Sequence, residues 1–264
     1  MTHTLRNDRI YGHARYTALY DIELGDFRED LPFYRRHLPA KPCAILELGC
    51  GTGRVSRALA ADGHRLTGID LSYPMLAAAD RTSSAPAPQY ACMDMTALAF
   101  RTTFGAIIAP YNTLNLLTEP EALRACLSQV HHLLAKDGVL LMQLYIPDQD
   151  LLSLEGKKRF QFQIFDRTDG SKVIKEILKS TTPQSNLVEI TERYYLRFRK
   201  DLPNEDWQYT YQILGYDFEQ WRDIFAGQGF RLEAAYGGYD LAPFIQGEHT
   251  TLLLVAKKAA SNPQ

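Results

Sequence analysis

The sequence is poor in cysteine, and its few cysteines are not spaced as metal ligands. There are four, Cys43, Cys50, Cys92 and Cys126, with no Cys-x-x-Cys pair among them. Cys43 and Cys50 flank a short apolar segment, where they fit as small apolar residues. This pattern excludes a disulfide framework and predicts free thiols in a reducing cytoplasm, with no metal site.

The sequence also lacks a long apolar run and an excess of charge of either sign. No apolar segment approaches the roughly 18 residues of a membrane-spanning helix, and the polar residues 1–8 do not resemble a leader. The formal net charge is −2, so no broad cationic surface is expected to hold a nucleic acid backbone. We therefore expect a cytoplasmic protein that binds neither membranes nor nucleic acids.

What the chain does have is a glycine-rich loop directly after an apolar segment. Residues 45–53 read Ile-Leu-Glu-Leu-Gly-Cys-Gly-Thr-Gly, with Gly49, Gly51 and Gly53 at alternating positions. Glycine has no Cβ and tolerates positive φ, so this loop lets the backbone approach a bound nucleoside closely. A dinucleotide loop would need glycine where Arg54 stands, and a P-loop would need Gly-Lys-Ser/Thr. The loop therefore predicts a nucleoside site of another kind.

Apolar segments alternate with helical patterns on both sides of this loop, which is typical of a doubly wound parallel sheet. The expected strands cover 44–48, 64–69, 89–93, 104–110, 139–146, 231–236 and 250–256. From residue 157 the pattern changes to polar–apolar alternation, which predicts four antiparallel strands with one face in water. The sequence thus predicts an α/β fold with an inserted antiparallel β subdomain.

Three parts follow from this order of elements. Residues 1–40 are expected to form lid helices, 41–156 together with 215–264 a cofactor-binding core, and 157–214 the insert. The insert would serve as a substrate lid or as an oligomer contact. Its exposed strand edge could pair with a second copy of the chain to form a homodimer.

Candidate binding residues follow the predicted strands, because ligands of doubly wound sheets lie across the carboxyl ends of the strands. Asp70 ends the second strand, 21 residues after Gly49, where a carboxylate can accept hydrogen bonds from both ribose hydroxyls. Asp94 ends the third strand, and Tyr111 and Asn112 follow the fourth. Asp70 supports a nucleoside without choosing which one.

The stretch Glu47-Leu48-Gly49-Cys50-Gly51-Thr52-Gly53 closely resembles motif I of the class I S-adenosylmethionine-dependent methyltransferases. The resemblance covers residues 44–147, and residues 229–256 resemble the closing helix, sixth strand and antiparallel seventh strand of that fold. It implies a Rossmann-like sheet, mostly parallel with an antiparallel last strand. The implied cofactor is S-adenosyl-L-methionine, with S-adenosyl-L-homocysteine as product and no metal.

Within that superfamily, the chain looks like the small-molecule branch of amino-sugar and glycine N-methyltransferases. Tyr20-Asp21, residues 109–114 and the antiparallel insert carry this likeness. It implies that Tyr16 or Tyr20 contacts the carboxylate end of the cofactor. The sequence departs from many relatives at Asn115, where they carry a histidine, which puts a catalytic role there in doubt.

The resemblance also implies that Asp94 binds the adenine amino group and that Met95 packs on the ring. The residues expected to bind the cofactor are Tyr20, Glu47, Gly49, Cys50, Gly51, Gly53, Asp70, Leu71, Met75, Asp94, Met95, Pro110 and Tyr111. The catalytic candidates are Tyr111, Asn112 and His249, and Tyr145 and Tyr239 join them as candidate contacts of the acceptor.

The predicted function is methyl transfer to a nitrogen or oxygen of a small molecule. This reaction is an in-line displacement that demands alignment in a closed site more than an acid–base pair. A nucleic-acid or protein methyltransferase is an alternative, but Ala109-Pro110-Tyr111 lacks the acid or amide and the first proline of the nucleic-acid enzymes. A non-enzymatic cofactor-binding protein of the same fold is another. An NAD(P) oxidoreductase ranks last for want of the third glycine.

Overall fold

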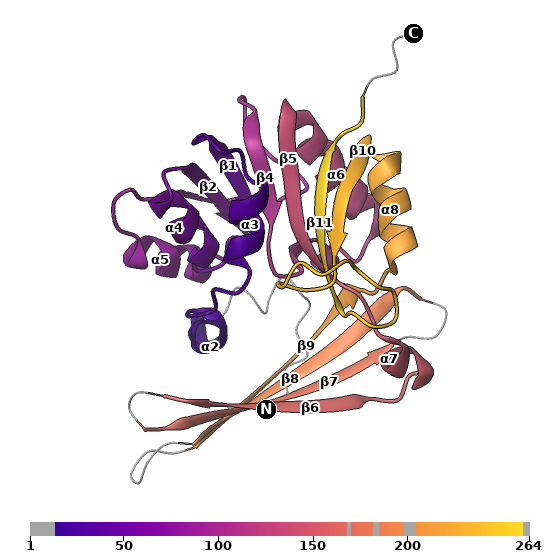
Figure 1. The fold of residues 1–264 in the computed structure, drawn as a ribbon. Helices are drawn as coiled ribbons and strands as arrows, with labels where there is room; N and C mark the ends of the chain where they lie inside the picture. Colours follow the sequence, from indigo (N-terminus) through magenta and orange to yellow (C-terminus); the bar gives the residue numbers. More distant parts are fainter. Residues whose placement is uncertain (1–13, 168–169, 182–184, 198–203, 261–264) are drawn as a thin grey trace.

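A computed structural model describes residues 14–167, 170–181, 185–197 and 204–260. Within them the chain forms a seven-stranded sheet and, below it in Figure 1, a four-stranded sheet. The first 13 residues of the predicted lid lie outside the described part. No helix in that part is both long and apolar enough to cross a membrane.

The larger sheet has the doubly wound arrangement that the sequence predicts. Its strand order is β10-β11-β5-β4-β1-β2-β3, and its central pairs are parallel, while β11 runs antiparallel to β5 and β10. The strands are β1 Ala44–Leu48, β2 Arg65–Asp70, β3 Gln89–Cys92, β4 Phe104–Ala109, β5 Leu134–Tyr145, β10 Phe230–Tyr236 and β11 Thr251–Lys258. The α/β fold class with an antiparallel last strand is therefore confirmed.

One strand is longer than predicted. β5 begins at Leu134, whereas the pattern indicated a strand from residue 139. Phe104 of β4 pairs with Leu134, and Ala106 pairs with Val139, so the extra residues of β5 form an irregularity inside the ladder. Sequence patterns do not reveal such an irregularity, because it depends on the partner strand.

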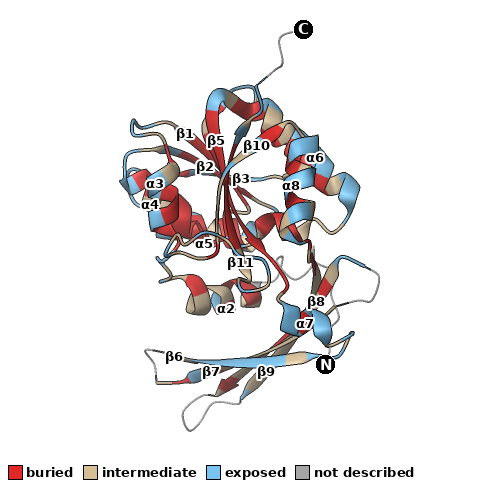
Figure 2. Cartoon of the chain, turned by 45° about the vertical axis from the view of Figure 1, so that its right-hand side comes forward, coloured by how far each residue is buried: buried red, intermediate tan, exposed pale blue. Residues whose placement is uncertain are grey.

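Helices cover both faces of this sheet, and its strands form the buried centre of the molecule in Figure 2. Leu127 of α6 and Trp221 of α8 belong to the apolar cluster on one face, and Tyr34 of α3 and Leu59 of α4 to that on the other. The helices are α2 Ala14–Leu24, α3 Leu31–His37, α4 Arg54–Ala61, α5 Tyr73–Thr82, α6 Pro120–Leu133, α7 Gln149–Ser153 and α8 Phe218–Gly227, with a 3-10 turn η1 Thr113–Leu116.

The second sheet is antiparallel, in the order β6-β7-β8-β9. Its strands are β6 Arg159–Asp166, β7 Lys172–Thr181, β8 Leu187–Arg197 and β9 Glu205–Leu214. α2 lies between the two sheets, because its Leu19 packs with Met75 of α5 and with Val173 of β7 (Figure 1). β6 is an edge strand with exposed Phe160 and Phe162. Pairing of that edge with a second copy stays a prediction, as does the division into domains.

A buried ion pair fixes the N-terminal segment to the start of α4. The Nη1 and Nη2 atoms of Arg54 donate to the two carboxylate oxygens of Asp30 at 2.7 and 2.6 Å, and both side chains are buried. Nη1 also donates to the carbonyl of Phe27 at 2.9 Å. Arg54 stands where a dinucleotide loop would have glycine, so this position serves to dock the preceding segment.

We expect Asp30→Ala to lower the free energy of unfolding by about 3–5 kcal/mol, because it leaves a buried guanidinium without its counter-charge. Urea denaturation followed by circular dichroism would measure the loss. The matched control is Asp62→Ala, whose ion pair with Arg35 is largely exposed and should contribute at most about 1 kcal/mol. Similar small losses in both variants would contradict the prediction.

Candidate functional site

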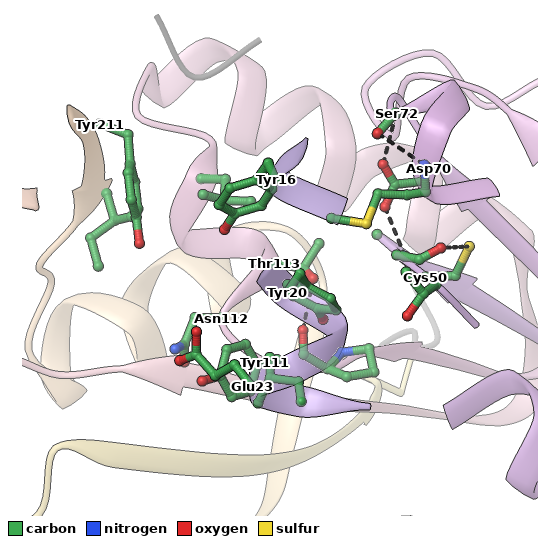
Figure 3. A pocket seen from close by; sticks show the side chains of 18 of the residues that line it. Tyr16, Tyr20, Glu23, Cys50, Asp70, Ser72, Tyr111, Asn112, Thr113 and Tyr211 are labelled. Carbon is green, nitrogen blue, oxygen red and sulfur yellow. Dashed lines mark hydrogen bonds between the residues drawn. The ribbon is translucent and has the colours of Figure 1, made fainter. Parts of the chain in front are cut away.

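A cavity of about 550 Å³ lies between the carboxyl ends of the central parallel strands, α2 and one face of the second sheet. Such a volume suits a small-molecule site. Figure 3 shows its two ends: Cys50, Asp70 and Ser72 lie on one side, Tyr211 of β9 lies on the other, and Tyr20 and Tyr111 stand between them.

The three glycines of the loop meet different neighbours, and all have positive φ. A Cβ on Gly49 would lie 2.6 Å from Cγ2 of Thr113, and one on Gly53 would overlap the hydroxyl of Tyr90. These two positions therefore need glycine because of protein neighbours. Gly51 differs, since its Cβ would only reach ordinary contact with Tyr20. Gly49 and Gly51 line the cavity and Gly53 does not, so Gly53 keeps the loop close to β3 instead of meeting a ligand.

Asp70 lines the cavity, where the sequence places a nucleoside. Its Oδ2 accepts the N–H of Gly51 at 2.9 Å, and its Oδ1 accepts the N–H of Ser72 at 2.8 Å. Burial raises the pKa of Asp70 above its usual value, against the effect of these N–H groups. The backbone N–H of Leu71 bonds the carboxylate as well, which leaves about one of its four lone-pair sites for a further donor. The carboxylate thus fixes the loop and remains able to accept a hydrogen bond from a ligand.

A second carboxyl, that of Glu47, lies behind the loop and also lines the cavity. It is almost fully buried and accepts a hydrogen bond from the hydroxyl of Ser56. Burial raises the pKa of Glu47 to about 8. A cationic ligand beside Glu47 would therefore favour its charged form.

The N-terminal helix α2 supplies tyrosines to the cavity. The ring of Tyr20 lies over Gly51, and burial raises the pKa of its hydroxyl. Tyr16 also lines the cavity, but its ring meets Tyr209 of β9 edge-on, with 5.2 Å between the ring centroids. Of the two predicted lid tyrosines, Tyr20 therefore faces the glycine loop, and Tyr16 joins α2 to the second sheet.

Tyr111 and Asn112 follow β4 and line the middle of the cavity. Both have left-handed backbone, with φ of +50° and +63°. Non-glycine residues are uncommon there, and such strain concentrates at functional sites. Oδ1 of Asn112 is buried and has no hydrogen-bond partner among the described residues. Burial raises the pKa of the Tyr111 hydroxyl, so it stays protonated at neutral pH.

On the side of the second sheet, the cavity contains a charged cluster that the sequence did not reveal. The Nζ atom of Lys175 lies 2.6 Å from Oε2 of Glu23 and 2.8 Å from Oε1 of Glu192. The hydroxyls of Tyr194 and Tyr211 donate to Glu192 at 3.1 and 3.2 Å. These three charged residues, the acidic cluster, line the cavity and carry one net negative charge when all are ionised.

A signal for this cluster existed in the sequence. Val173, Lys175 and Ile177 occupy alternate positions of β7, and alternate residues of a strand share one face. A lysine in an apolar register is expensive unless it is paired. Its carboxylate partners, on α2 and β8, are too distant in the sequence for any local pattern to identify.

Two further predicted residues lie outside the cavity lining. Asp94 is exposed, and its Oδ1 accepts the N–H and the hydroxyl of Thr96, both at 2.8 Å. His249, a catalytic candidate, also lies outside the lining, and its catalytic role stays a prediction. Its Nδ1 accepts the N–H of Ile245 at 3.0 Å, and its ring packs against Phe244, so it organises the loop before β11.

Some of the other predicted residues line the cavity, and others do not. Tyr239 lies outside the cavity lining and donates a hydrogen bond to Oε1 of Gln143 at 2.8 Å, whereas Tyr145 lines the cavity. Asn115 is fully buried and binds the carbonyls of Tyr145 and Leu214, so it joins β5 to β9. The remaining cofactor candidates line the cavity: Tyr20, Glu47, Gly49, Cys50, Gly51, Asp70, Leu71, Met75, Met95, Pro110 and Tyr111.

Part of this chain is similar to known proteins. Residues 45–138 match the family described as "Methyltransferase domain". A Geobacillus sp. (strain WCH70) protein named "Putative methyltransferase GWCH70_2453" is 35% identical over 103 residues, 38% of this chain. "Putative methyltransferase YqeM" of Bacillus subtilis (strain 168) is 29% identical over 143 residues, 50% of this chain. The matches span 42% and 58% of these relatives, so less than two thirds of either.

Solved structures share the whole fold. The CcbJ methyltransferase of Streptomyces caelestis superposes with a TM-score of 0.76 at 18% identity, over 96% of this chain and 100% of its own. CalS10, an amino pentose methyltransferase from Micromonospora echinaspora, gives 0.72 at 19% identity, over 93% and 97%. Residues 45–138 thus match a methyltransferase family, and the chain has the fold of S-adenosylmethionine-dependent methyltransferases.

Proposed function

We propose that the chain transfers a methyl group from S-adenosylmethionine to a nitrogen atom of a small molecule bound in this cavity. The observation that carries the proposal is that one cavity joins the glycine loop and Asp70 to the acidic cluster of the second sheet. A nucleoside-binding end and an end suited to a cationic acceptor thus lie in one enclosed space.

The residues at the first end fit the cofactor. Gly51 leaves free the space that a Cβ would fill, and Asp70 keeps a lone-pair site for a ribose hydroxyl. The orphaned Oδ1 of Asn112 suits a donor such as the cofactor's ammonium group. Glu47 and Tyr20 would complete that end. When bound, S-adenosylmethionine supplies a methyl group activated by a sulfonium.

The chain's own residues then have to position the acceptor and exclude water. α2 and the second sheet cover the cavity, while Tyr111 offers a protonated hydroxyl between its two ends. The net negative charge of the acidic cluster attracts a cationic amine. Burial raises the pKa of the Glu23 carboxyl, which makes it a suitable acceptor for the proton that an ammonium must lose.

Nitrogen is favoured over oxygen because of the bases at hand. No histidine of the described residues lines the cavity, whose titratable groups are carboxyls, tyrosines, lysines, an arginine and a cysteine. A hydroxyl acceptor requires a stronger base than a carboxylate, whereas an amine only has to lose its extra proton. KedS8, a sugar N-methyltransferase, shares the fold and makes amino sugars a sensible first class to test.

Titration calorimetry with S-adenosylhomocysteine and NAD, followed by turnover of S-adenosylmethionine with matched amines and alcohols, tests the proposal. We expect micromolar binding of S-adenosylhomocysteine alone and methylation of amines alone. Binding of NAD in its place would refute the cofactor assignment, and methylation confined to alcohols would refute the acceptor.

We expect Asp70→Asn to weaken S-adenosylhomocysteine binding about 10- to 100-fold, since it removes the charge from the hydrogen bond to the ribose. Calorimetry would measure it, with circular dichroism to confirm folding. Asp94→Asn is the matched comparison, because Asp94 follows the neighbouring strand but is exposed and off the cavity lining. An equal loss of affinity in Asp94→Asn would support the contact between Asp94 and adenine that the sequence predicts.

We also expect cofactor affinity to rise with pH and then level off above about 8, the pKa of Glu47. Below that pKa the buried carboxyl is protonated in the free protein, so a cationic ligand that favours its charged form must displace the proton. Calorimetry in buffers of different ionisation enthalpy measures the proton released. Glu47→Gln is the control, because in this variant only the ligand's own amino group titrates. If the variant released as many protons on binding as the wild type, Glu47 would be excluded as their source.

A further inference from the structure

Two lysines of β7 line the cavity, and the charges around them differ. Lys175 and Lys179 are four residues apart on one strand, so they share a face and their Cα atoms are separated by about 13 Å. Lys175 is held between two carboxylates. Among the described residues, Lys179 has no carboxylate within ion-pair distance. The end of the cavity beside Lys179 therefore differs in charge from the acidic cluster.

Glu192 and Asp148 act on Lys179 only from beyond ion-pair distance. Its Nζ atom lies 4.7 Å from the ring centroid of Tyr145, and Arg159 of β6 is its register partner. Arg159 is already paired with Asp148, with Nη1 at 2.6 Å from Oδ2. Lys179, Arg159 and Asp148 together carry one net positive charge when ionised. Lys179 is partly buried, and this burial together with the charge of Arg159 lowers its pKa.

Tyr145 provides an independent second observation. Its side chain lines the cavity and the residue is only 6% exposed. Its hydroxyl is buried without a hydrogen-bond partner among the described residues. Burial raises its pKa to about 12, so the hydroxyl remains a donor. A buried donor without an acceptor costs free energy that a ligand with an acceptor would recover.

We propose that Lys179 and Tyr145 form a subsite for an anionic group of the methyl acceptor, a carboxylate or a phosphate. The proposal rests on the function proposed above, because that function assigns this part of the cavity to the acceptor. An anion there receives an ammonium and a hydroxyl donor, which both lack a polar partner in the described structure. The acceptor would thus carry its nitrogen near the acidic cluster and its anionic group farther along β7, beside Lys179 and Tyr145.

A set of matched probes tests this subsite without turnover. Hexylamine, 6-aminohexanoate and 6-aminohexyl phosphate share one amine and differ only in the group at the other end. Each is titrated by calorimetry into the free protein and into the complex with S-adenosylhomocysteine. We expect at least one bifunctional probe to bind about tenfold or more tightly than hexylamine, given the usual strength of charged hydrogen bonds. The carboxylate and phosphate arms identify which anion the subsite prefers.

Variants test whether Lys179 and Tyr145 cause a preference for the bifunctional probes. Lys179→Met should abolish it, and Tyr145→Phe should reduce it. Lys179→Arg keeps the cation and should retain the preference. If Lys179→Met fails to fold, Lys179→Arg is measured in its place. The matched control is Lys172→Met, because Lys172 lies on the same strand but is exposed and paired with Asp166. It should behave as the wild type.

Three results would overturn the subsite: equal binding of hexylamine and both bifunctional probes, no binding of either bifunctional probe, or a preference that survives Lys179→Met. A failure of S-adenosylhomocysteine to bind the wild type would instead count against the proposed function. The two failures are distinguishable because the probes are also titrated without it.

Discussion

The arrangement of α2 against the second sheet depends on the ammonium of Lys175 between Glu23 and Glu192. These residues come from β7, α2 and β8, and Glu23 is 152 positions from Lys175 in the sequence. Burying three charges costs more desolvation than a single pair returns, so the arrangement is favourable only when all partners are present. The same contact that holds the N-terminal helix on the second sheet therefore gives the cavity its acidic end.

The two sheets contribute to the cavity in different ways. The parallel sheet presents the ends of its strands, where backbone N–H groups and Asp70 are fixed together. The antiparallel sheet presents a face, so the alternate residues Lys175, Ile177 and Lys179 of β7 line the cavity. A slip of one residue in the register of β7 would turn Lys175 and Lys179 away from the cavity. The second-sheet side of the cavity thus depends on strand pairing, and the side at the glycine loop depends on loop geometry.

These differences explain what could be predicted from the sequence. The fold and the place of Asp70 follow from local patterns, because an apolar strand and the residue after it are contiguous and parallel strands align their ends. Asp94 shows the limit of that logic, since the nearby Thr96 takes one of its oxygens in a local turn. His249 lies in a segment without periodicity, and no pattern could show that it faces Ile245. The acidic cluster was missed because its partners meet only after the second sheet has formed.

The left-handed backbone of Tyr111 and Asn112 has a consequence for engineering this chain. Glycine adopts that conformation without steric cost, so glycine at either position would relieve backbone strain of about 1–2 kcal/mol per residue. The same replacement would remove a hydroxyl and a carbonyl oxygen from the middle of the cavity. A selection for thermostability alone would therefore accept changes here that a selection for ligand binding would reject, and the two residues mark where stability and activity compete.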